Sequence, residues 1–240
     1  MSVMLLSEVR RLLRAPRFLI FTIGFPVAFL VIMSGIYAPD PGDTLGLVVL
    51  MLNMAAYGAI SAAVSTGGLV ATERALGWNR QLRLTPLPAW GYLAVKAAVA
   101  MLVALPALAL VLAVGAALGV DLPLLTWVEV LGAAWGGMLP FAAIGLLVGT
   151  LATPDSAQGM TMVTMLTFSL LGGIFIPAQL LPPVMLSIAQ ALPSFWLADL
   201  AGRPALGGGL PLEGVAVLAA WLVAAGGLAI WRYRRDAVRV

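Results

Sequence analysis

Long apolar stretches separated by short polar breaks organise this chain. A helix needs ~20 predominantly apolar residues to cross the hydrocarbon core of a bilayer. Six stretches reach that length: Phe18–Tyr37, Leu45–Ala71, Leu93–Leu118, Trp127–Leu151, Ala157–Ile176 and Leu212–Trp231. The breaks between them are rich in proline, which disfavours a helix in the residue before it. The pattern therefore predicts an all-α integral membrane protein with six transmembrane helices.

The segment before the first apolar stretch is basic. It carries four arginines: Arg10, Arg11, Arg14 and Arg17. A secretory signal peptide also has a basic start, but its apolar run is shorter and ends at a small-residue cleavage site. The run here has spanning length, and the turn that follows it lacks such a site. We therefore interpret it as a retained first span.

Basic residues gather on one side of the predicted topology. Cytoplasmic loops of membrane proteins are enriched in lysine and arginine. With six spans and a cytoplasmic amino terminus, twelve of the thirteen basic residues fall inside and only Arg203 falls outside. The outer side instead collects Asp40, Asp43, Asp121, Glu129, Asp199 and Glu213. This separation predicts a multi-pass protein of the plasma (inner) membrane with both termini in the cytoplasm.

Two of the predicted connections are unusually long. Thr72–Tyr92 is charged and polar enough to leave the bilayer on the cytoplasmic side. Residues 177–211, on the outer side, contain two apolar pieces too short to span, Val184–Leu192 and Phe195–Ala201. Short apolar helices broken by prolines fit re-entrant or interfacial segments, which are tolerated where protein covers their backbone. We therefore expect outer re-entrant helices between the fifth and sixth spans.

Composition agrees with a lipid environment and limits the chemistry. Hydrophobic residues make up 62% of the chain and charged residues 10%, against ~45–50% and ~25% in soluble proteins. Cysteine and histidine are absent, which removes the thiol nucleophile, the usual proton shuttle and the commonest metal ligands. Lys96, the single lysine, does not follow a glycine, so the chain has no Walker A loop for ATP. We expect no catalytic residue, metal site, bound cofactor or nucleic-acid partner.

A stand-alone secondary carrier or channel is the alternative function. Ion-coupled carriers commonly place an ionisable side chain near the middle of the membrane. The middle of every predicted span lacks such a residue, and we expect Glu129 and Lys96, near span ends, to extend to the interface. Proton coupling is therefore disfavoured, whereas sodium coupling through backbone carbonyls stays open.

The Thr72–Tyr92 connection is the candidate contact with a partner that supplies energy. Arg80 and Arg83 lie one helical turn apart, and Trp78 and Leu82 offer apolar anchors. The alternative is an ordinary basic loop that lies on anionic lipid. The residue types alone fit both interpretations.

The same connection carries a resemblance to a known family. Its pattern Glu73-Arg74…Gly77…Gln81-Leu82-Arg83-Leu84-Thr85-Pro86-Leu87 closely resembles the E-R-x-x-G-x-x-x-x-L-x-x-T-P-L stretch of ABC-2-type permeases. These are the membrane subunits of type V ATP-binding-cassette exporters. A basic amphipathic amino-terminal helix, the Gly-Gly-Ile-Phe-Ile-Pro stretch that begins at residue 172, and a last span with a basic tail also agree. The resemblance covers nearly the whole chain.

The resemblance implies an exporter permease that is a single transmembrane domain over residues 1–240. Residues 1–17 would form an interfacial helix, and the 72–92 loop would dock on a separate ATPase. Two ATPase subunits would bind ATP and Mg, and a second permease subunit, identical or different, would complete the assembly among membrane lipids. The coupling positions would be Glu73, Arg74, Gly77, Trp78, Arg80, Leu82 and Arg83, with a second contact around Asp155 in the Thr153–Ser156 turn.

Two helix faces are candidates for the substrate pathway. Polar side chains recur every four residues on one face of the second stretch: Asn53, Tyr57, Ser61 and Ser65. The fifth stretch presents Thr161, Thr164, Met165 and Phe168. Helix packing is the alternative, since small polar residues also line tight interfaces in membranes. Neither face carries a fixed charge, so we expect a hydrophobic or amphipathic substrate such as a drug, an antibiotic or a lipid-like compound.

Overall fold

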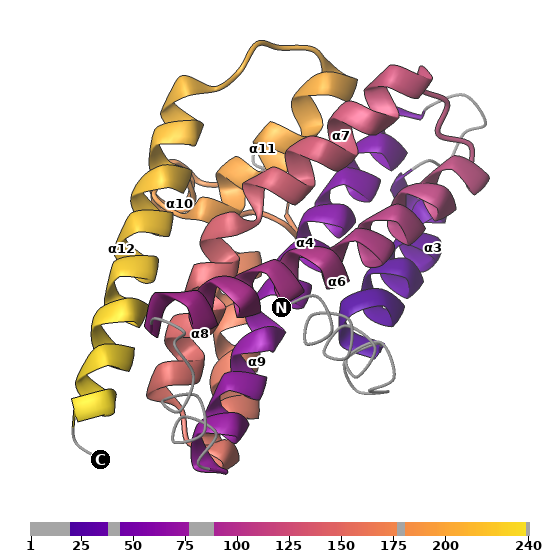
Figure 1. The fold of residues 1–240 in the computed structure, drawn as a ribbon. Coiled ribbons are helices and arrows are strands. Elements are labelled where there is room, and N and C mark those ends of the chain that lie inside the picture. The colour runs from indigo at the N-terminus through magenta and orange to yellow at the C-terminus, as the bar shows by residue number, and fades with distance from the viewer. Residues whose placement is uncertain (1–19, 38–43, 77–88, 177–180, 239–240) are drawn as a thin grey trace.

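The structure, a computed structural model, describes residues 20–37, 44–76, 89–176 and 181–238. Helices and short connections make up this described part, and no strand occurs within it (Figure 1). In chain order the elements are η1 (Ile20–Gly24, a π-helix), α3 (Phe25–Tyr37), α4 (Leu45–Ala75), α6 (Ala89–Ala117), α7 (Leu124–Gly137), α8 (Leu139–Leu151), α9 (Pro154–Leu171), α10 (Pro183–Gln190), α11 (Pro193–Leu206) and α12 (Leu212–Val238). The all-α prediction is confirmed for these residues. The predicted interfacial helix, residues 1–17, lies outside them.

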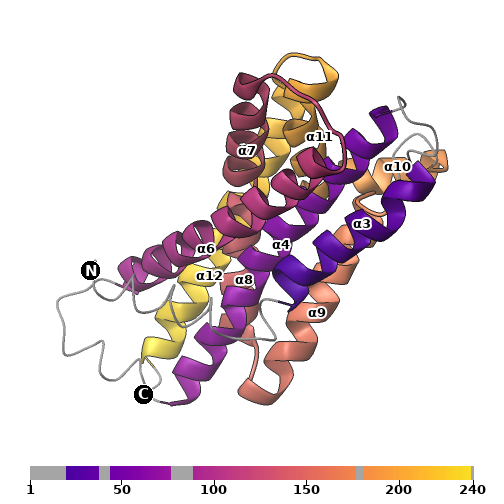
Figure 2. The same ribbon diagram turned by 90° about the vertical axis from the view of Figure 1, so that its right-hand side faces the viewer.

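Helix α4 lies at the centre of the bundle. It packs against α3, α6, α8, α9 and α11, and most of its side chains are buried. Helix α12 is peripheral and packs mainly on α8 and α11. Figures 1 and 2 show that α4, α8 and α12 finish at the lower end of the molecule, where α9 begins, whereas α7 and α11 lie at the upper end. We use the terms lower end and upper end in this sense.

The described residues contain four helices long and apolar enough to cross a membrane. They are α4, α6, the combined α7–α8 and α12, and they match the second, third, fourth and sixth predicted spans. Residues Thr22–Ile36 form a shorter apolar helix. Helix α9 covers most of the predicted fifth span but is only 18 residues long and begins with polar side chains. The chain is therefore a multi-pass membrane protein, while the count of six spans stays a prediction.

A bent helix pair occupies the proline-rich segment predicted to hold two short helices. Helices α10 and α11 meet at an angle of 85°. The indole N–H of Trp196 donates to the carbonyl of Gln190 at 2.6 Å, and that of Trp221 donates to the carbonyl of Ala191 at 3.0 Å. The last carbonyls of a helix lack partners within it, so these tryptophans stabilise the bend. Its placement as a re-entrant segment stays a prediction.

Glycines bring the backbones of α4 and α8 into direct contact. A Cβ atom built on Gly67 would overlap the carbonyl oxygen of Gly145, and one on Gly149 would overlap the carbonyl oxygen of Gly67. Small residues allow this close approach, which is a principal source of helix association in lipid. The contact lies close to the lower end and fixes the position of α4 there.

Candidate functional site

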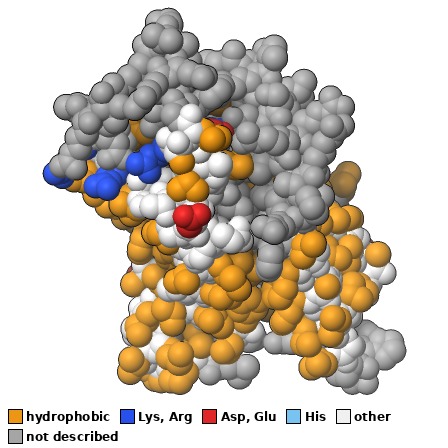
Figure 3. Space-filling model, turned by 90° about the horizontal axis from the view of Figure 1, so that it is seen from below, with side chains coloured by type: hydrophobic (Ala, Val, Ile, Leu, Met, Phe, Trp, Pro, Cys, Tyr) orange, Lys and Arg blue, Asp and Glu red, His pale blue; other side chains and the backbone are white. Residues whose placement is uncertain are grey.

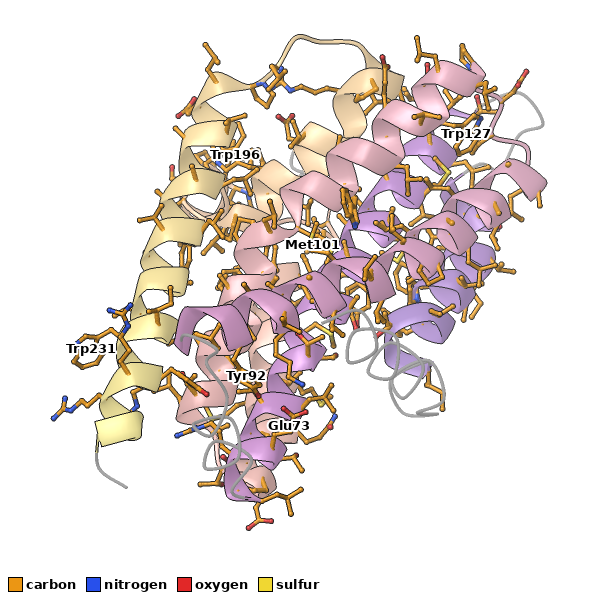
Figure 4. All side chains as sticks on the ribbon, viewed as in Figure 1. Glu73, Tyr92, Met101, Trp127, Trp196 and Trp231 are labelled. Atoms are coloured by element: carbon orange, nitrogen blue, oxygen red, sulfur yellow. The ribbon has the colours of Figure 1, made fainter. Side chains whose placement is uncertain are left out.

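A buried polar network joins the last turn of α4 to the beginning of α6. The ammonium group of Lys96 lies 2.7 Å from Oε1 of Glu73. The hydroxyl of Tyr92 donates to Oε2 of the same carboxylate, also at 2.7 Å. Tyr92 and Lys96 are four residues apart on α6, so they share one face of that helix. Figure 4 shows Glu73 and Tyr92 close together near the lower end of the bundle.

The burial of Lys96 corrects an expectation from the sequence. We expected its side chain to extend to the membrane interface, but its exposed fraction is 0%, and that of Glu73 is 8%. A buried charge is tolerated only when it is paired and hydrogen-bonded. Glu73 supplies the opposite charge, and Tyr92 binds the second carboxylate oxygen, so the pair is stable inside the protein. Tyr92 and Lys96 are one helical turn apart in the sequence, but that spacing does not point to Glu73 as their partner.

Two further contacts extend this network to α8 and α12. The Tyr92 ring stacks on Tyr233 of α12 with ring centroids 5.4 Å apart. Arg74 donates through Nη1 to the carbonyls of Gly149 and Thr150 at 3.2 and 2.5 Å. Gly149 and Thr150 belong to the last turn of α8. A cationic side chain placed there stabilises the carbonyl groups that end a helix. The end of α4 is therefore bound directly to α6 and α8, and indirectly, through Tyr92, to α12.

The structure places the predicted coupling residues in two groups. Glu73 and Arg74 belong to α4, which continues to Ala75, so they are helical and inward-facing rather than part of a loop. The connection itself covers residues 76–88. Five predicted positions lie outside the described residues: Gly77, Trp78, Arg80, Leu82 and Arg83.

Asp155 is exposed in the first turn of α9 at the lower end. A capping box holds this turn: the backbone N–H of Ser156 donates to the Thr153 hydroxyl at 3.3 Å, and the N–H of Thr153 donates to the Ser156 hydroxyl at 3.0 Å. A carboxylate in the first turn also suits the helix dipole. Figure 3 looks onto this end and shows basic side chains at one edge of a largely hydrophobic described surface.

The predicted pathway face of α4 divides into a packed part and a more open part. Tyr57 is buried against Phe25 and Phe175, with ring centroids 4.9 and 5.5 Å away. The Ser61 hydroxyl lies 3.3 Å from that of Thr22. Ser65 and Asn53 are half-buried, and Asn53 lines a pocket between α4 and α11. Within one chain, Tyr57 and Ser61 therefore contribute to helix packing.

The predicted face of α9 lies mostly inside the bundle. Thr161, Met165 and Phe168 are buried, and Thr164 is half-buried. The Phe168 ring makes edge contacts with Phe141 and Trp221, each with centroids 5.5 Å apart. Among the described residues the buried Thr161 hydroxyl has no hydrogen-bond partner. This face therefore packs against neighbouring helices within a single chain.

The fold is that of a multi-pass helical membrane protein. Polar and aromatic contacts connect α4, α6, α8 and α12 at its lower end. The family model described as ABC-2 type transporter matches residues 1–201, and the chain belongs to this family. A protein of Bacillus subtilis (strain 168) named "Putative transport permease YvfS" is 26% identical over 221 residues, which cover 91% of this chain and 90% of that protein. The family resemblance carried by residues 73–87 is thus confirmed.

Proposed function

We propose that this chain is the transmembrane permease subunit of an ABC exporter. ATP hydrolysis by a separate ATPase subunit drives outward transport of a hydrophobic or amphipathic substrate, such as a drug, an antibiotic or a lipid-like compound. Two permease subunits, identical or different, associate with two ATPase subunits, which bind the ATP and Mg. The lower end faces the cytoplasm with both termini, and α10 and α11 form the outer re-entrant segment.

The buried network of Glu73, Tyr92 and Lys96 is the observation that carries this proposal. It joins the helices on either side of residues 76–88, the connection that the family resemblance assigns to the ATPase. A force applied to this connection reaches α4 and α6 together, because a buried, hydrogen-bonded ion pair resists separation. Arg74 and Tyr92 pass the displacement to α8 and α12. Glu73 and Arg74 thus act as positioning residues, and the residues that follow them contact the ATPase.

The test compares ATPase co-purification and vesicle transport for variants of the connection. Trp78→Ala and Leu82→Ala should reduce recovery of the ATPase several-fold, since apolar anchors dominate such contacts. Arg83→Lys should reduce transport, because lysine does not reproduce the planar fork of arginine. Arg235→Lys, at an exposed position of α12, is the matched control and should retain both properties. Wild-type behaviour in all three connection variants would support the loop on lipid instead.

The buried Lys96–Glu73 pair also favours the second candidate, a stand-alone carrier, because coupled carriers use ionisable groups inside the membrane. The position of the pair favours a structural link between α4 and α6 over an ion-coupling site. Lys96 lies seven residues into α6, only ~10 Å from the start of that helix and not near its middle. Vesicles that contain the permease alone decide between the two. We expect no ATP hydrolysis and no uptake driven by a proton or sodium gradient; gradient-driven uptake by the wild-type permease alone would establish the carrier.

A further inference from the structure

A pocket of about 260 Å³ opens between α4 and α11. Helix α11 lies at the upper end of the molecule (Figure 1). Helix α4 contributes Val49, Leu52 and Asn53, and the charged lining residues of α11 are Asp199 and Arg203. Twenty residues of α4 separate Asn53 from Glu73, which corresponds to ~30 Å along the helix. The pocket is therefore distinct from the lower-end network.

The two charged residues of the pocket form an accessible ion pair. Nε of Arg203 donates to Oδ2 of Asp199 at 2.8 Å, and Nη1 donates to the carbonyl of Gly209 at 2.9 Å. The side chains are 33% and 31% exposed. A guanidinium group has five N–H donors, so within the described residues three of them, and the second oxygen of Asp199, have no hydrogen-bond partner. Both charges can still bind a ligand.

The remaining walls offer one polar group and an apolar surface. The half-buried amide of Asn53 can donate and accept hydrogen bonds. Leu52 and Leu206 supply apolar contacts on either side of Gly202. A Cβ atom on Gly202 would lie 3.6 Å from Leu52 and 3.5 Å from Leu206, so the missing side chain leaves space between them. A water occupies ~30 Å³ in the liquid, so the pocket suits a small polar group rather than a whole lipid.

The balance of charge in the pocket selects among ligands. A lone anion that binds Arg203 would compete with Asp199 and leave the carboxylate without its counter-charge. A lone cation that binds Asp199 would leave Arg203 without its counter-charge. A ligand with both charges contacts both residues. Arginine is suited to phosphate and carboxylate through paired hydrogen bonds, and aspartate is suited to an ammonium group. Apolar side chains beside the pair suit a neighbouring hydrocarbon chain.

We propose that this pocket binds a zwitterionic group, with its phosphate or carboxylate on Arg203 and its ammonium on Asp199 and Asn53. The group is a lipid headgroup or a soluble zwitterion of the same chemistry. This site goes beyond the proposed function, because binding here requires neither the ATPase nor transport.

The test measures lipid binding to the purified full chain in an uncharged maltoside detergent. Native mass spectrometry follows titrations with diheptanoyl phosphatidylcholine, which is zwitterionic, and diheptanoyl phosphatidylglycerol, which is anionic and has the same chains. The choline ammonium has no N–H and is attracted to Asp199 by charge alone, whereas phosphatidylglycerol offers Asp199 no positive charge, so we expect a preference of about tenfold or more for phosphatidylcholine. Equal affinities, or a preference for phosphatidylglycerol, would overturn the proposal.

Variants of the pocket residues test whether the preference for phosphatidylcholine arises at this pocket. Asp199→Asn leaves the positive charge alone and should reverse the preference towards phosphatidylglycerol. Asn53→Leu leaves the ion pair intact and should weaken phosphatidylcholine binding several-fold, so the test does not depend on a charge variant that fails to fold. Glu213→Gln removes an exposed carboxylate at the start of α12, outside the pocket, and should change nothing. A wild-type preference in both pocket variants would refute the assignment.

Competition distinguishes the two sources of the zwitterion. Glycerophosphocholine carries the same headgroup without acyl chains. Displacement of phosphatidylcholine by glycerophosphocholine at similar concentration would identify a soluble zwitterion as a sufficient ligand. Binding that needs the chains would identify a lipid or another zwitterionic amphiphile. If ATP-driven export fails while this binding persists, the proposed function is wrong and the site stands.

Discussion

Lys96 is completely buried, and its ammonium group lies 2.7 Å from the Glu73 carboxylate. The exposed pair of Asp199 and Arg203 has nearly the same separation, 2.8 Å, but both of its side chains are about one-third exposed. Water screens the second pair and not the first, so the same geometry has different energetic consequences.

We expect Lys96→Met to destabilise the protein by about 3–5 kcal/mol, because it leaves the Glu73 carboxylate buried without its counter-charge. In a chain of this size that corresponds to a fall in the apparent melting temperature of roughly 10 °C. Adding Glu73→Gln should recover most of the loss, since the Tyr92 hydroxyl can donate to the glutamine carbonyl. Thermal unfolding in detergent measures all three proteins.

The partly exposed ion pair of Asp199 and Arg203 provides the control for the Lys96 and Glu73 variants. Arg203→Gln should change the melting temperature little, because exposed ion pairs contribute ~0–1 kcal/mol. If Lys96→Met and Arg203→Gln lowered the melting temperature equally, burial would not set the strength of the Lys96–Glu73 pair.

Residue patterns in the sequence anticipated only part of this site. Glu73 and Arg74 were identified from a family motif, but their inward orientation depends on where α4 ends, which the motif does not specify. Lys96 was assigned to the interface because a single charge near a span end is usually solvated. Its burial requires Glu73, 23 residues away, and such a pairing between two helices has no local signature in the sequence.

Among the elements, the contact between α4 and α8 depends on the absence of side chains. We expect Gly67→Val to destabilise the protein by about 1–3 kcal/mol, since any Cβ there would overlap the backbone of Gly145. The neighbouring Gly68 is the control, because a Cβ at that position meets nothing within 4 Å. Gly68→Val should therefore have a much smaller effect on the apparent melting temperature. Similar effects from both would exclude the close helix contact as the cause.

The hydrophobic pattern predicted where the helices lie in the sequence better than it predicted how they are oriented relative to one another. The apolar stretches located α4, α6, α7–α8 and α12, because each must be apolar along its length to lie in lipid. The prolines at 182, 183 and 193 mark the starts of α10 and α11, whereas the assignment of these helices as re-entrant stays a prediction. The 85° angle between α10 and α11 was not predictable, since it depends on hydrogen bonds from Trp196 and Trp221.

At the scale of the whole molecule, the separation of charges makes a prediction about topology. The chain has no cysteine, so single cysteines can be introduced without removing native ones. Cysteines at Asp43 and Arg203 should react with an impermeant maleimide applied to intact cells, and one at Gln81 should react only after the membrane is opened. Reaction at Gln81 in intact cells would contradict the six-span arrangement with cytoplasmic termini.

The unequal burial of α4 and α12 has a consequence for how such a sequence can change over time. In the most apolar stretch of α4, 89% of residues are buried, against 22% in α12. A lipid-facing position accepts almost any apolar residue, whereas a packed position is sensitive to a single methylene. Mutational drift should therefore proceed quickly along α12 and slowly along α4. A saturation library scored for transport should accept leucine, isoleucine, valine and phenylalanine interchangeably at Val223 and reject most exchanges at Ile60.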